Sequence, residues 1–326
     1  MIRGVSALTP PLGRPLTEPT EYIRDLAVLR SAVQFRDAKS VAAAFEALPD
    51  EDARASASWT VAETPGCGDF LRETAAGHPG HPLFRTLYAN HLIQAGWEIR
   101  SGARAEHVSR QQFDSFHAHL RHAEVLLIDV CAEYPAYALA WYLRITTARG
   151  LELGQGEARR RYERLAEYHP HHYSGQSQLL QQLCPKWGGS WEAAEGFARA
   201  CAEAAPEGGP QGALVAVAQM ERYLEIQRDQ NTRAAETYLR EPIQHTALLH
   251  AAARSVLHPA ARTDSFTYVG AHSAFATAHS AAGRHADAAP HFRALGDRTT
   301  EFPWSYLGAD HSAVFARHRK TALAQG

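Results

Sequence analysis

The chain has 326 residues, of which 45% are hydrophobic and 21% are charged. These fractions are typical of a folded globular protein and exclude a largely disordered one. The formal net charge at pH 7 is -2, so the overall charge predicts binding neither to nucleic acid nor to an anionic membrane.

The cysteines and the N-terminal sequence bear on the compartment of the protein. The four cysteines form no Cys-x-x-Cys pair, which favours a reducing compartment over a disulfide framework. They are Cys67, Cys131, Cys184 and Cys201. The N-terminus lacks the charged-then-apolar pattern of a secretory signal, and no stretch approaches the roughly 18 apolar residues that a membrane span requires. We therefore expect a cytoplasmic protein.

The first 82 residues divide into three segments. Residues 1–19 are rich in proline and threonine and predict an extended leader. Residues 20–52 predict a helical hairpin, from about Glu21 to Leu48. Residues 53–82 have little periodicity and contain several glycines and prolines, so we expect a loop or hinge there, with a plain linker favoured over a functional loop.

Residues 83–206 repeat one helical pattern. Three similar segments end at Pro135, Pro170 and Pro206, which are 35 and 36 residues apart, and a proline at this point stops a helix. A small residue lies 12 positions before each proline: Ala123, Ala158 and Ala194. This pattern resembles the tetratricopeptide repeat, a helix-turn-helix unit of about 34 residues. The resemblance implies a stack of helical hairpins that bury their apolar faces on one another.

The C-terminal part, residues 207–326, also predicts helical hairpins. Within it, Gly283 falls in a turn and Ala288 and Phe292 fall on the following helix, as in one tetratricopeptide repeat. No segment of the chain has the alternating pattern of a strand. The predicted fold class is therefore all-α, an α-solenoid of tetratricopeptide-like helical hairpins.

The stretch Pro-Lys-Trp-Gly-Gly-Ser at 185–190 has two interpretations. A nucleotide-binding loop needs Gly-x-x-x-x-Gly-Lys-[Ser/Thr] after a strand, whereas this lysine precedes the glycines and follows a helical pattern. An elbow between two helices explains the glycines as a tight turn and Ser190 as a helix N-cap. We favour the elbow; an anion site at Lys186 and the next helix N-terminus is the alternative.

Four segments in order resemble an uncharacterised family of bacterial proteins with tetratricopeptide-like helices. They are GWEIRSGARAEHVS, AEVLLIDVCAEYP, TTARGLELG and CPKWGGSWEAAEGFAR. The resemblance covers Leu83 to Cys201 and implies a helical-repeat fold, but no activity. The positions that match the family pattern are Trp97, Arg100, Lys186, Trp187, Gly188, Gly189 and Ser190.

The 19 histidines form three clusters that we weighed as metal sites. The clusters are His117, His119 and His122; His169, His171 and His172; and His78 and His81. His117 points about 200° away from His119 on a helix, so that cluster does not converge. Solvated or hydrogen-bonded histidines are favoured over a metal site in each cluster. No hydrolase or dinucleotide signature is present either, so we expect no cofactor and favour a protein without catalysis.

In tetratricopeptide arrays the first helix of each hairpin lines a concave groove that takes peptides. The register set by Pro135 predicts that Tyr142, Thr146 and Arg149 face this groove. In the next repeat it predicts the same of Ser177, Gln178 and Gln181. An exposed arginine such as Arg149 can hold a carboxylate through two hydrogen bonds. The candidate ligand-binding residues are Trp97, Arg100, Tyr142, Arg149, Gln178, Gln181, Lys186, Trp187 and Ser190.

The predicted function is a non-catalytic scaffold that binds a protein or peptide in this groove. The alternative is a small-molecule enzyme or ligand sensor with a pocket inside the helical array, formed by Arg100, Lys186 and the histidines. An open groove would favour the first function, and a closed pocket with convergent polar groups would favour the second.

Overall fold

The computed structural model describes residues 12–101 and 108–326. Within these residues the structure contains α-helices and no β-strand. The N-terminal helices are α1 (Pro19–Tyr22), α2 (Arg24–Gln34), α3 (Ala38–Glu46), α4 (Glu51–Ala62), α5 (Cys67–Gly77), α6 (Pro82–Arg100), α7 (Arg110–Glu133), α8 (Ala138–Gly150) and α9 (Gly154–Tyr168). The others are α10 (Tyr173–Leu183), α11 (Trp191–Ala204), α12 (Ala213–Asp229), α13 (Thr232–Arg240), α14 (Pro242–Arg254), α15 (Tyr268–Ala281), α16 (His285–Leu295) and α17 (His311–Gln325). None of the described helices has the length and apolarity to cross a membrane. The all-α prediction is confirmed.

The helix ends predicted from the prolines are present. The helices α7, α9 and α11 each end two residues before their proline, at Glu133, Tyr168 and Ala204. The three alanines 12 positions upstream are fully buried in the hydrophobic core. Small side chains at these places let neighbouring helices approach closely.

The loop expected over residues 53–82 is wrong, because α4 and α5 occupy most of this segment. Asp50 caps α4 by accepting a hydrogen bond from the backbone N–H of Ala53 at 2.8 Å. The helix buries small residues around most of its circumference, so its sequence shows no apolar stripe. Only the turn around Gly66, where φ is +73°, and the turn before Pro82 remain of the expected loop.

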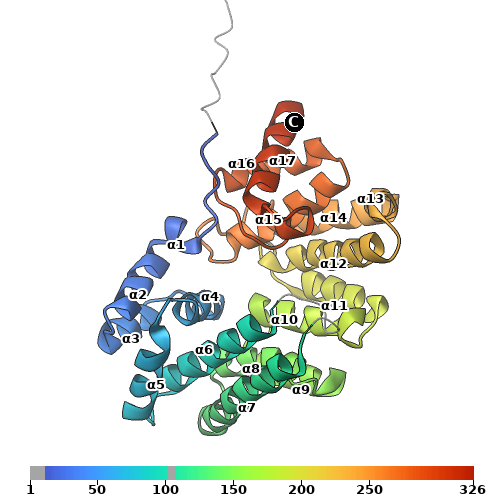
Figure 1. Cartoon of the computed structure of the whole chain (residues 1–326). Helices are drawn as coiled ribbons and strands as arrows, with labels where there is room; N and C mark the ends of the chain where they lie inside the picture. Colours follow the sequence, from blue (N-terminus) through green and yellow to red (C-terminus); the bar gives the residue numbers. More distant parts are fainter. Residues whose placement is uncertain (1–11, 102–107) are drawn as a thin grey trace, which may run out of the picture.

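Consecutive helices pack on one another along a curved path (Figure 1). The path runs from α2 through α6–α9 to α10–α12 and on to α15–α17. Helices two places apart in the path also pack on each other, as α6 does on α8, α8 on α10, and α10 on α12. The helix α4 contacts α6, α8 and α10, so it lies against the same side of the array.

The two ends of the described chain meet. Leu16 exchanges backbone hydrogen bonds with the segment after α16, donating to Asp297 at 2.7 Å and accepting from Thr299 at 2.9 Å. Arg319 on α17 is 2% exposed and donates to the backbone carbonyl of Gly13 at 2.7 Å. The N-terminal segment therefore lies along α16 and α17 (Figure 1). Residues 1–11 of the expected leader lie outside the described residues; residues 12–18 are non-helical, and α1 begins at Pro19.

Candidate functional site

One pocket opens where α4, α6, α8 and α10 meet the short 3-10 turn η2 (Pro185–Trp187). Its volume is about 300 Å³. The lining side chains are Trp59, Gln94, Trp97, Thr146, Arg149, Gln178, Gln181, Lys186 and Trp187. Six of the nine residues predicted to bind a ligand are in this lining. We call it the tryptophan pocket.

Arg149 lies between two indole rings in the tryptophan pocket. Its guanidinium carbon is 5.8 Å from the ring centroid of Trp97 and 5.7 Å from that of Trp187. One guanidinium nitrogen donates to the backbone carbonyl of Gln178 at 3.3 Å. Among residues 12–101 and 108–326, Arg149 has no carboxylate partner within ion-pair distance. Burial lowers its pKa to about 10, so the side chain still carries its charge at neutral pH.

The elbow at 185–190 positions Trp187, and its interpretation as an elbow is confirmed. Gly188 has φ of +81°, a backbone angle that glycine adopts without strain. A Cβ at Gly189 would overlap the backbone of Leu183, so the turn requires glycine there. The side chain of Ser190 accepts a hydrogen bond from Ala193 at 3.1 Å and caps α11. Ser190 thus serves the helix and is absent from the pocket lining.

Lys186 lines the pocket, but its charge is already paired. Its ammonium lies 2.6 Å from the carboxylate of Glu221 on α12, whose side chain is 2% exposed. Glu221 also accepts hydrogen bonds from Gln181 at 2.6 Å and from Tyr306 at 2.7 Å. Arg149 is therefore the lining cation that has no carboxylate partner among the described residues.

Two other predicted residues lie beside the tryptophan pocket and do not line it. Tyr142 is buried in the core, where its hydroxyl accepts a hydrogen bond from the Trp59 indole at 2.6 Å. Burial raises the pKa of Tyr142 to about 12. The guanidinium of Arg100 lies 5.5 Å from the Trp97 ring centroid, at the C-terminal end of α6.

Three residues at or under the pocket were not among those predicted to bind a ligand. Trp59 was hidden in the segment taken for a loop, and Gln94 precedes the first clear repeat marker. Glu221 lies on α12, beyond the segment from Leu83 to Cys201 that the family resemblance covers. The one signal for Trp59 was an isolated tryptophan two residues before Val61 in an alanine-rich stretch, because such a large aromatic side chain usually packs on neighbouring groups.

In each of the three histidine clusters of the sequence, one histidine makes a local hydrogen bond. His172 accepts from the backbone N–H of Gly175 at 2.9 Å and caps α10. His119 and His78 each bond the backbone carbonyl four residues earlier, at 2.8 Å and 3.0 Å. None of the three clusters places three metal-ligand atoms together within the described part of the chain.

No protein-family model matches the chain, and no match to a curated protein is found. Functional inference therefore depends on the geometry of the chain itself.

Proposed function

We propose that the protein is a non-catalytic binding module that takes a carboxylate-bearing peptide or protein segment in the tryptophan pocket. The observation that carries the proposal is Arg149, a charged side chain held between two indole rings with no carboxylate partner among the described residues. A partly buried cation without a counter-ion is costly, and a ligand carboxylate would offset that cost. The planar guanidinium also matches a carboxylate in shape.

Two further atoms in the lining favour a ligand that has amide groups. Thr146 Oγ1 and Gln178 Oε1 are buried and have no hydrogen-bond partner in the described part of the chain. Thr146 is 2% exposed. The amide oxygen can accept from a peptide N–H, and the hydroxyl can donate to a peptide carbonyl. A segment that presents a carboxylate next to a peptide bond would satisfy these atoms and Arg149 together.

The arrangement of the lining supports a tetratricopeptide-like binding mode. Apart from Lys186 on η2, its polar residues come from α6, α8 and α10, the helices that alternate along the array. In tetratricopeptide arrays such alternate helices line the peptide groove.

We also propose a cytoplasmic location, since all four cysteines are free and buried.

A small carboxylate molecule is the second candidate ligand. The pocket volume of about 300 Å³ favours it, because small-molecule sites span about 300–1,000 Å³. Native mass spectrometry of the purified chain separates the two candidates. A small bound mass that is lost in Arg149→Gln would replace the peptide by a small molecule as the ligand.

The test of the peptide proposal is a tryptophan-fluorescence titration with a set of acidic peptides, each with a free or an amidated C-terminus. We expect at least one peptide to quench the pocket tryptophans, and Arg149→Gln to weaken its binding at least tenfold. The matched control is Arg317→Gln, an exposed arginine on α17 outside the pocket lining. Equal affinities of wild type and Arg149→Gln, or no binding by any acidic peptide, would contradict the proposal.

A further inference from the structure

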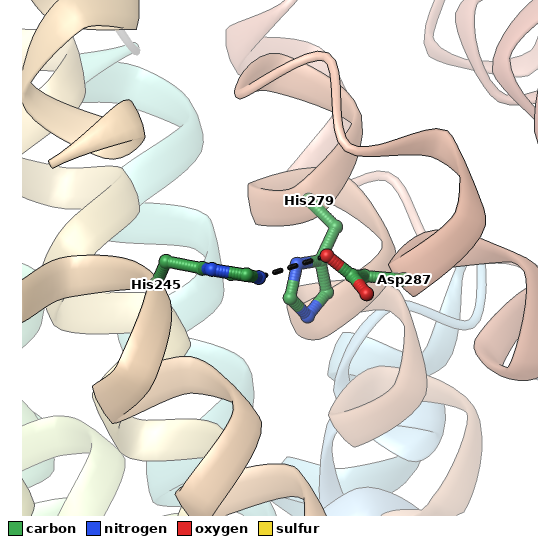
Figure 2. Close-up of side chains that lie close together, drawn as sticks. All are labelled: His245, His279 and Asp287. Atoms are coloured by element: carbon green, nitrogen blue, oxygen red, sulfur yellow. Dashed lines mark hydrogen bonds and ion pairs between the residues drawn. The ribbon is translucent and has the colours of Figure 1, made fainter. Parts of the chain in front are cut away.

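Two histidines and an aspartate from three helices meet at one point outside the tryptophan pocket (Figure 2). They are His245 on α14, His279 on α15 and Asp287 on α16. His245 Nε2 lies 2.8 Å from a carboxylate oxygen of Asp287, and the rings of His245 and His279 are 6.3 Å apart and perpendicular. One ligand atom from each residue lies within 4.8 Å of the other two.

His279 has unused ligand capacity. The residue is fully buried, and neither ring nitrogen has a hydrogen-bond partner among residues 12–101 and 108–326. Leaving a buried polar atom without a partner costs about 1–3 kcal/mol, so this arrangement calls for an explanation. Burial lowers the pKa of His279 to about 4, which keeps the imidazole neutral, the form that binds metals.

We propose that His245, His279 and Asp287 bind a divalent transition-metal ion, with zinc as the ion that their chemistry fits. Two imidazoles and one carboxylate suit zinc and its first-row neighbours, whereas calcium and magnesium prefer oxygen ligands alone. Tetrahedral zinc needs ligand atoms about 3.3 Å apart, so the three groups have to move only slightly to reach it.

The exposure of the three residues fits a site that an ion can reach. The side chains of His245 and Asp287 are 23% and 32% exposed, whereas His279 forms the buried floor. Three protein ligands leave a fourth position for water on the exposed side. Behind the floor, the His279 ring stacks on His291 at 5.8 Å, and this packing fixes the plane of the ring.

Metal binding here would join α14 to the α15–α16 hairpin, because each of the three helices contributes one ligand. An ion that binds the folded chain in this way raises the apparent stability of that state. The site is separate from the tryptophan pocket and shares no residue with its lining. Its presence or absence therefore leaves the peptide-binding proposal untouched.

The experiment uses the full, untagged chain after dialysis against a chelator. Zinc chloride is titrated calorimetrically, and Co²⁺ is added separately to read its visible absorption, which reports tetrahedral coordination. We expect one equivalent of zinc to bind and to raise Tm. Asp287→Asn and His245→Gln, both at partly exposed positions, should weaken zinc binding at least tenfold and remove the rise in Tm.

The matched control is His250→Gln, an exposed histidine on the same helix as His245. It should bind zinc like the wild type. A further variant, His279→Phe, removes the unpartnered nitrogens and should lose zinc binding while it keeps or gains stability without metal. The proposal is overturned if wild type binds no zinc, if Asp287→Asn and His245→Gln bind it as wild type does, or if His250→Gln loses as much affinity as they do.

Discussion

The carboxylate of Glu221 accepts a hydrogen bond from the hydroxyl of Tyr306 at 2.7 Å, although the two residues are 85 positions apart in the chain. Gln181 and Lys186 donate to the same carboxylate, so one side chain of α12 connects the elbow of the tryptophan pocket to the segment before α17. Burial and the nearby carboxylate both raise the pKa of Tyr306, which keeps it a hydrogen-bond donor.

Replacing Glu221 by Gln should destabilise the protein. The amide keeps the size of the side chain but removes the charge that pairs with Lys186. Its NH₂ group is itself a donor, and it would face a donor at a position where a carboxylate oxygen now accepts a hydrogen bond. We expect a loss of about 1–3 kcal/mol in the free energy of unfolding. Urea denaturation measures it, with Glu203→Gln at an exposed site of α11 as the control. Equal losses in the two variants would contradict the role given to Glu221.

Two glycine-to-alanine changes near the elbow should have opposite signs. Gly189→Ala would push a Cβ into the backbone of Leu183 and should cost about 1–3 kcal/mol. Gly196 lies inside α11 with open space around it, so Gly196→Ala should stabilise the protein by about 0.5–1 kcal/mol. Thermal denaturation of both variants distinguishes the effects. A Gly189→Ala protein as stable as wild type would show that the turn tolerates a side chain.

Acid should weaken the fold through His318. This ring stacks on the buried Trp304 at 6.0 Å, and burial together with Arg317 lowers the pKa of His318 to about 4. In the unfolded chain His318 binds a proton as the pH falls below about 6.5, whereas in the folded chain it binds that proton only near pH 4. The contribution of His318 to stability is therefore present above pH 6.5 and is lost as the pH falls from 6.5 towards 4.

The check is a comparison of wild type with His318→Gln by urea denaturation at several pH values. The glutamine does not titrate, so wild type should lose more stability than the variant between pH 6.5 and 4. Between pH 7 and 8 the difference between the two proteins should stay constant. Parallel stability curves over the acid range would assign the pH dependence to other groups.

Local signals in the sequence located much of the fold. The three prolines marked real helix ends, and Ser190 and the glycines marked a real elbow, because caps and turns are decided by residues close in sequence. The register from Pro135 also brought Arg149 to the same pocket as Gln178 and Gln181. Thr146 and Arg149 share a face of α8, and Gln178 and Gln181 share a face of α10, because residues three positions apart lie on the same side of a helix.

Other features depend on packing between distant segments, which one sequence does not display. The helix α4 is buried around most of its circumference, so it lacks the periodicity that reveals a surface helix. Glu221 matters through Tyr306 and Lys186, neither of which is near it in sequence. The cluster of His245, His279 and Asp287 combines three helices, whereas the clusters visible in the sequence bring no three ligand atoms together in the described residues.

The contact of Leu16 and Gly13 with the segment around α17 changes how the chain is expected to unfold. In an open stack of hairpins each end has one uncovered face, and local opening begins there. Here Gly13 accepts a hydrogen bond from Arg319 of α17, and Leu16 pairs with the segment after α16, so this end of the array has contacts that an open stack lacks. Trimming the N-terminal residues up to Leu16 would remove the Gly13 acceptor of Arg319 and the backbone pairing with Asp297 and Thr299, so the stability of the last hairpin depends on a segment some 300 positions earlier in the chain.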